Sequence, residues 1–161
     1  MSASADSGGG PTGAAGPRVR WSPGSWASRW LPVLGWMALI FLLSAQPGLR
    51  VSDDASVDRP IRTLAHLASY AVLAALLVRA LLTGSRPTRV AAIGAWVVAV
   101  LYGVSDEIHQ SFVPDRTGRP SDVLIDAIGA AIGVVLAMVL LSAMERRRRK
   151  AGSPPESART G

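Results

Sequence analysis

The sequence predicts an all-α membrane protein, a bundle of four transmembrane helices with disordered termini. Of its 161 residues 49% are hydrophobic, and these are concentrated in four long apolar runs. Each run reaches the roughly 17 residues that a helix needs to cross a bilayer. The 17 basic residues flank the runs and do not gather beside aromatic residues on one face, so no nucleic-acid partner is expected. The predicted surrounding is the lipid bilayer.

The first apolar run covers residues 30–46 and carries no charge. Residues 1–29 are rich in Gly, Ser, Ala and Pro, which predicts a disordered tail with an interfacial segment near Trp21 and Trp26. An alternative is a secretory signal peptide, because arginines precede the run and small residues at its end resemble a cleavage site. The three further runs favour a membrane span.

The later runs alternate with short polar connections. Residues 61–82 follow an acidic loop, and residues 90–108 follow a short basic turn. The fourth run, residues 121–144, is expected to begin with Ser121 or Asp122 as its N-cap. A basic block then ends the run.

Charge predicts the orientation of the spans. Most basic residues lie before the first run, between the second and third, and after the fourth, whereas the acids concentrate in the other two connections. By the positive-inside rule, this distribution places both termini in the cytoplasm of a protein that crosses the cell membrane four times. The predicted organisation is a disordered tail at 1–29, a transmembrane domain at 30–144 and a basic, disordered cytoplasmic tail at 145–161.

Polar side chains of three spans are expected to meet at the non-cytoplasmic end of the bundle. The second and fourth spans enter from that side and the third arrives there, which puts these side chains in one leaflet. Ionisable groups that face lipid cost about 2.5–3.5 kcal/mol each, so we expect the acids to point inward and pair with Arg62, His66 or Arg116. The three spans contribute Arg62, His66 and Tyr70, then Tyr102, Asp106 and Glu107, then Asp122 and Asp126.

Each of these residues also has a purely structural interpretation. Asp106 and Asp122 can be solvated at the membrane interface, and Tyr102 can belong to an aromatic belt. Arg62 can extend its charged end to the surface. For His66 and the remaining acids, the structural alternative is an ion pair that only holds helices together.

No known catalytic or cofactor motif accompanies the polar residues. There is no cysteine, and no Walker loop, G-x-G-x-x-G or G-x-S-x-G pattern. Gly129 and Gly133 form G-x-x-x-G, for which close helix packing is the expected role. No cofactor and no metal is predicted, because the spacing matches no metal motif even though suitable ligand types are present in His66, Glu107, His109, Asp122 and Asp126.

One region resembles a known family. It reads YG-x-x-DEIHQ-x-F-x-P-x-R from Tyr102, then SD-x-x-x-D-x-x-G-x-x-x-G, with a histidine and a tyrosine four residues apart on the preceding span. This order and spacing resemble the VanZ-like family of small bacterial membrane proteins, whose founder is associated with resistance to the glycopeptide teicoplanin. The resemblance implies functional positions at His66, Tyr70, Glu107, Gln110, Phe112, Pro114, Arg116, Asp122 and Asp126.

Two positions depart from the family pattern. Asp126 stands where the family usually has Asn, and Arg62-Thr63 stand where an Asp-Lys pair often precedes the histidine. A mechanism that relies on that ion pair is not expected for this chain.

Three functions remain open from the sequence. The first is binding of an anionic or polar envelope component, such as a lipid-linked or glycopeptide ligand, with Arg116 as a bidentate donor. The second is a transporter or scaffold subunit that acts as a homo-oligomer. The third is an enzyme on a lipid or cell-wall precursor, with His66 as acid or base beside Glu107 or Asp126. We rank them in that order.

Overall fold

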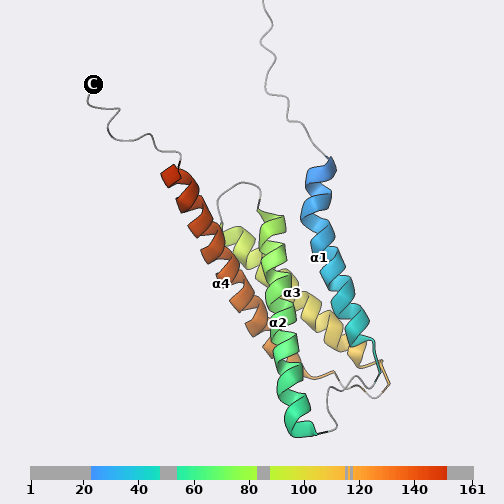
Figure 1. Ribbon diagram of the computed structural model, residues 1–161. Helices are drawn as coiled ribbons and strands as arrows, with labels where there is room; N and C mark the ends of the chain where they lie inside the picture. Colours follow the sequence, from blue (N-terminus) through green and yellow to red (C-terminus); the bar gives the residue numbers. More distant parts are fainter. Residues whose placement is uncertain (1–22, 48–53, 83–87, 115, 117, 152–161) are drawn as a thin grey trace, which may run out of the picture.

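A computed structural model describes residues 23–47, 54–82, 88–114, 116 and 118–151. The described chain forms four α-helices in up-and-down order, which confirms the predicted all-α bundle (Figure 1). They are α1 (Pro23–Ser44), α2 (Ala55–Leu81), α3 (Arg89–Gln110) and α4 (Pro120–Ala151). All four are long and apolar enough to cross a membrane.

The helices extend beyond the predicted runs. The first helix begins at Pro23, so the last residues of the predicted N-terminal tail are helical. The fourth continues through the basic block to Ala151, because its long unbranched side chains are good helix formers and Arg149 donates to Glu145 over 2.7 Å, one turn away. The predicted disorder of 1–22 and 152–161 lies outside the described residues.

Residues at the N-terminal ends explain where α2 and α4 begin. The carboxylate of Asp54 caps α2 by accepting the backbone N–H of Ser56 at 2.8 Å, and the side-chain and backbone hydrogen bonds from Ser56 lower the pKa of Asp54. The expected N-cap of the fourth helix was wrong. Pro120 is the first residue of α4, where its missing N–H needs no partner, and Ser121 and Asp122 follow it inside the first turn.

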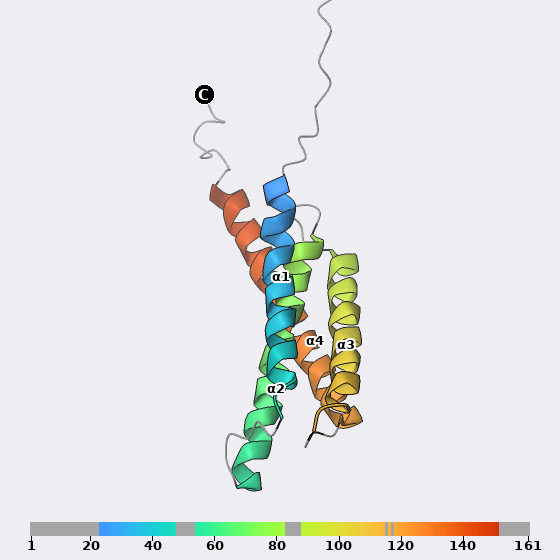
Figure 2. The same ribbon diagram turned by 90° about the vertical axis from the view of Figure 1, so that its right-hand side faces the viewer.

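Helix α2 is the centre of the bundle. It packs most extensively on α4 and also contacts α1, which lies in front of it in Figure 2, and α3. Helices α1 and α4 lie apart (Figure 1) and make no contact among the described residues. Its buried side chains, including Leu73, Leu77 and Val78, form most of the apolar core. The indole of Trp36 ties α1 to this centre by donating to the carbonyl of Ser69 at 2.9 Å.

Small residues let the other helices approach closely. The buried face of α3 carries Ala91, Ala95, Ala99 and Gly103 at every fourth position. On α4, Gly129 and Gly133 lie directly against the α2 backbone, so that a Cβ on either would collide with the carbonyl of Leu67 or Ala71 respectively. Close backbone approach of this kind supports helix association where lipid supplies no hydrophobic driving force.

Large apolar side chains cover the outside of the bundle. Leu42, Val90, Leu101 and Leu136 are each more than half exposed, while half of the buried apolar residues in the described part of the chain are alanines. This distribution suits hydrocarbon surroundings, in which apolar groups lose nothing by facing outward.

Candidate functional site

Buried polar side chains gather at one end of the bundle. This end, called the site end below, is where α1 and α3 finish and α2 and α4 begin, opposite the start of α1 and the finish of α4 (Figure 1). The buried face of α3 shows why the polarity changes along the axis. After Gly103 the same face continues with Asp106, Glu107 and Gln110, all of them buried. The buried stripe of α3 is therefore small and apolar first and polar in its last two turns.

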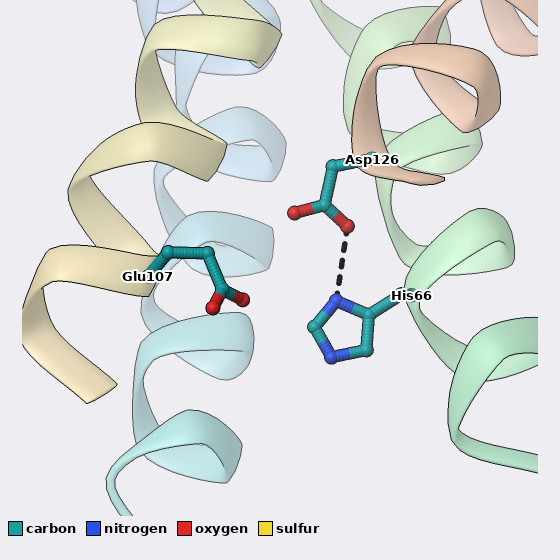
Figure 3. A group of neighbouring side chains, drawn as sticks. All are labelled: His66, Glu107 and Asp126. Carbon is teal, nitrogen blue, oxygen red and sulfur yellow. Dashed lines mark hydrogen bonds and ion pairs between the residues drawn. The ribbon is translucent and has the colours of Figure 1, made fainter. Parts of the chain in front are cut away.

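His66 and Asp126 join α2 to α4. The Nδ1 atom of His66 lies 3.0 Å from Oδ1 of Asp126, whose side chain is completely buried (Figure 3). The pairing of an inward-pointing acid with His66 agrees with the sequence analysis. The second carboxylate oxygen, Oδ2, is also buried and has no hydrogen-bond partner among the described residues.

Glu107 reaches the same place from α3. Its Oε2 accepts the backbone N–H of Arg119 at 2.8 Å, and its Oε1 accepts an N–H from Gln110 at 3.3 Å. Gly118 lies so close to the Glu107 backbone that a Cβ there would collide with the carbonyl oxygen. The segment before α4 therefore covers Glu107 and donates to its carboxylate.

Asp106 belongs to the buried polar group, contrary to the solvated alternative. Its side chain is 3% exposed, and Oδ1 accepts the hydroxyl of Ser44 at 2.6 Å while Oδ2 accepts from Gln110 at 3.0 Å. The sequence left Asp106 open between the polar group and a solvated position at the interface, and it did not place Ser44 in the site. The sequence feature that indicates burial of Asp106 is its position on the small-residue face of α3, one turn before Gln110.

Arg116 binds carbonyl groups where pairing with an acid was expected. Its guanidinium donates to Gln110 Oε1 at 3.3 Å and to the carbonyls of Leu43 and Gln46 at 3.4 and 3.3 Å. These carbonyls lie at the C-terminal end of α1, where helices leave backbone acceptors unsatisfied. Desolvation, together with nearby Arg62, lowers the pKa of Arg116 from its ordinary value. The residue thus clamps α1 onto α3.

A cavity of about 150 Å³ opens between α1, α2 and α3 at the site end. Ile40, Leu43 and Ile61 are among its apolar walls. Its polar lining includes Arg62, His66, Tyr70, Asp106, Gln110 and Arg116. Four residues that the family pattern implies, His66, Tyr70, Gln110 and Arg116, therefore share this cavity. Glu107 and Asp126 do not line it and face His66 from α3 and α4 (Figure 3).

Three other predicted residues, Tyr102, Asp122 and Phe112, lie outside the cavity lining. The hydroxyl of Tyr102 donates to the carbonyl of Met37 at 2.7 Å, so this side chain links α3 to α1 and does not belong to an exposed belt. Its ring packs against that of Tyr70, with centroids 6.3 Å apart. Asp122 is partly exposed at the start of α4 and bonds to the neighbouring Ser121. Phe112, implied by the family pattern, is 79% exposed.

The fold and the buried polar groups define a helical membrane protein with a polar site at one end of its bundle. Residues 29–141 match the model of the VanZ/LLP1 family. The match covers most of the chain, so the protein belongs to the VanZ/LLP1 family and is a membrane protein of the VanZ type. Neither a curated protein nor a solved structure shows a significant match.

Proposed function

We propose that this VanZ-type protein binds an amphiphilic envelope component whose anionic head group occupies the cavity at the site end. The observation that carries the proposal is the composition of the cavity, which combines apolar walls from α1 and α2 with two arginines. Apolar walls suit a hydrocarbon chain, and guanidinium groups bind phosphate or carboxylate with fixed geometry. A lipid-linked phosphate has both parts.

The two arginines have different roles in this proposal. Arg116 already donates to Gln110 and to the end of α1, so it shapes the cavity and has some donors left for a ligand. Arg62 lines the cavity and has no hydrogen-bond partner among the described residues. We therefore assign the main contact with the anion to Arg62.

The proposal includes the orientation that charge predicts. The site end then faces the non-cytoplasmic side of the cell membrane, and both chain termini are cytoplasmic. A head group in the outer leaflet reaches the cavity from that side. This orientation is also the one in which a glycopeptide such as teicoplanin, acting outside the cell, meets the same surface.

Binding of a polyprenyl phosphate to the purified full chain tests the proposal, with the corresponding phosphate-free polyprenol as the ligand control. We expect the phosphate to bind and the alcohol to bind much more weakly. Loss of one charged hydrogen bond in Arg62→Gln should weaken phosphate binding by about tenfold to a hundredfold. Arg59→Gln is the matched variant, because Arg59 is exposed on the same helix and does not line the cavity.

Arg116→Lys supplies a second arm of this experiment. Lysine keeps the charge and loses the planar fork, so binding should weaken together with the hydrogen bonds to α1. Equal affinity of wild type, Arg62→Gln and Arg116→Lys would contradict the proposal. In cells, teicoplanin tolerance conferred by the wild type and lost in Arg62→Gln would extend it to the resistance associated with the family founder.

A further inference from the structure

Three potential metal ligands lie close together beside the cavity, and one of them, His66, also lines it. His66, Glu107 and Asp126 come from α2, α3 and α4, and one donor atom of each lies within 4.8 Å of the others (Figure 3). One imidazole nitrogen and two carboxylate oxygens are a common ligand set for divalent cations such as Zn²⁺ and Mn²⁺. The sequence spacing could not show this set, because each ligand is on a different helix.

An unpartnered oxygen points to a missing ligand. The Asp126 side chain is 0% exposed, yet its Oδ2 atom has no hydrogen-bond partner among the described residues. Buried carboxylate oxygens ordinarily have donors, and a buried charged group left without one is more costly than a neutral polar group in the same position. In Figure 3 the Asp126 carboxylate points into the space between Glu107 and His66.

The negative charge of this cluster, made of His66, Glu107 and Asp126, also favours a bound cation. Glu107 and Asp126 carry two negative charges when ionised, and a third buried acid, Asp106, lies one residue before Glu107. Among the described residues, His66 is the single basic side chain that contacts either carboxylate of the cluster. Even a protonated His66 leaves a net negative charge in the bundle interior, where such charge is costly.

We propose that His66, Glu107 and Asp126 bind one divalent cation. The cation offsets the negative charge and gives Oδ2 of Asp126 a partner. Three protein ligands leave coordination positions for water or for a further ligand, as in metal sites that act on or hold a small molecule. His66 also lines the cavity, so a phosphate head group is the ligand class that would complete the site; this extension rests on the function proposed above.

Metal binding by the full chain in detergent micelles, without any lipid ligand, tests the inference. Protein stripped with EDTA is titrated with Zn²⁺ and with Mn²⁺ by calorimetry and, for Mn²⁺, by electron paramagnetic resonance. We expect one bound ion per chain. Glu107→Gln and Asp126→Asn keep the side-chain shape and remove one ligand charge, so each should weaken binding by about a hundredfold or more.

Asp122→Asn is the matched control. It removes the same charge from the same helix one turn before Asp126, and Asp122 is not part of the cluster. Its metal affinity should equal that of the wild type. The metal should also raise the unfolding temperature of the wild type and of Asp122→Asn but not of Asp126→Asn.

Absence of saturable binding of both metals to the wild type would overturn the inference. So would an equal loss of affinity in Asp122→Asn and Asp126→Asn, which would indicate general charge attraction. An infrared band of a protonated carboxylic acid that persists in the cluster at saturating metal would show that protons alone neutralise it. None of these results depends on lipid binding, so failure of the polyprenyl phosphate experiment would leave the metal site untouched.

Discussion

The hydrogen bond from Ser44 to Asp106 shows how single residues organise the site end. The Ser44 hydroxyl has one proton to donate. Its oxygen lies 2.6 Å from the Asp106 carboxylate and 3.1 Å from the carbonyl of Phe41, so the carboxylate is its main acceptor. Ser44 therefore gives Asp106, which is 3% exposed, a hydrogen bond from α1. Gln110 donates to the other oxygen of the same carboxylate. Together these bonds keep a costly charge satisfied inside the bundle.

Ser44→Ala should destabilise the protein by about 1–3 kcal/mol, because it leaves a buried carboxylate oxygen without its donor. The free energy of unfolding in bicelles or mixed micelles measures the change. Ser105→Ala is the control, since Ser105 is exposed on α3 and donates only within its own helix, to the carbonyl of Tyr102. Its effect should stay within about 0.5 kcal/mol. Equal effects of the two substitutions would contradict this role for Ser44.

Two glycines on α4 allow this helix to lie directly against α2. Gly129 and Gly133 face the backbone of α2 near Leu67 and Ala71, and they follow Asp126 on the buried face of α4. This close approach brings the Asp126 carboxylate within reach of His66. The packing of the two helices and the geometry of the polar site are therefore coupled.

Gly133→Ala should cost about 1–3 kcal/mol, because the added Cβ meets the Ala71 backbone and α2 cannot yield as a flexible side chain would. Gly35→Ala is the matched control on α1, where a Cβ would meet nothing within 4 Å. That variant should be neutral or slightly stabilised, since alanine is the better helix former. The same unfolding assay applies, and a stable Gly133→Ala protein would show that the α2–α4 contact is looser than described.

At the scale of the whole molecule, labelling at the two ends of the bundle tests the predicted orientation in the membrane. The connection between α3 and α4 belongs to the site end, and the finish of α4 belongs to the other end (Figure 1). The chain has no cysteine, so single cysteines can report on each end without a background. Ser111 and Ala151 are both exposed and lie at opposite ends.

In intact cells, a membrane-impermeant maleimide should label Ser111→Cys and leave Ala151→Cys unlabelled until the membrane is permeabilised. This expectation follows from the positive-inside rule, by which the basic block at the end of α4 is predicted to lie in the cytoplasm. Labelling of Ala151→Cys alone in intact cells would reverse the orientation and would contradict an outward-facing cavity. The cluster geometry behind the metal proposal would not be affected.

The sequence by itself determined the number and order of the helices and the end of the bundle that holds the polar groups. These features depend on local properties, namely the length of each apolar run and the position of charged residues within it. The N-cap of α4 was missed because Pro120 and Ser121 are both good first-turn residues, and hydrophobic pattern alone does not separate them.

Only the tertiary structure decided which polar groups meet. In the structure Asp126 pairs with His66, Asp106 lies inside the bundle, and Arg116 donates to the end of α1 where pairing with an acid was expected. Asp122 is partly exposed at the start of α4, and the hydroxyl of Tyr102 links α3 to α1. The physical reason is that such pairings depend on helix rotation and spacing to within an ångström or two. Small residues on facing helices set both, and no pattern along one helix encodes the shape of its neighbours.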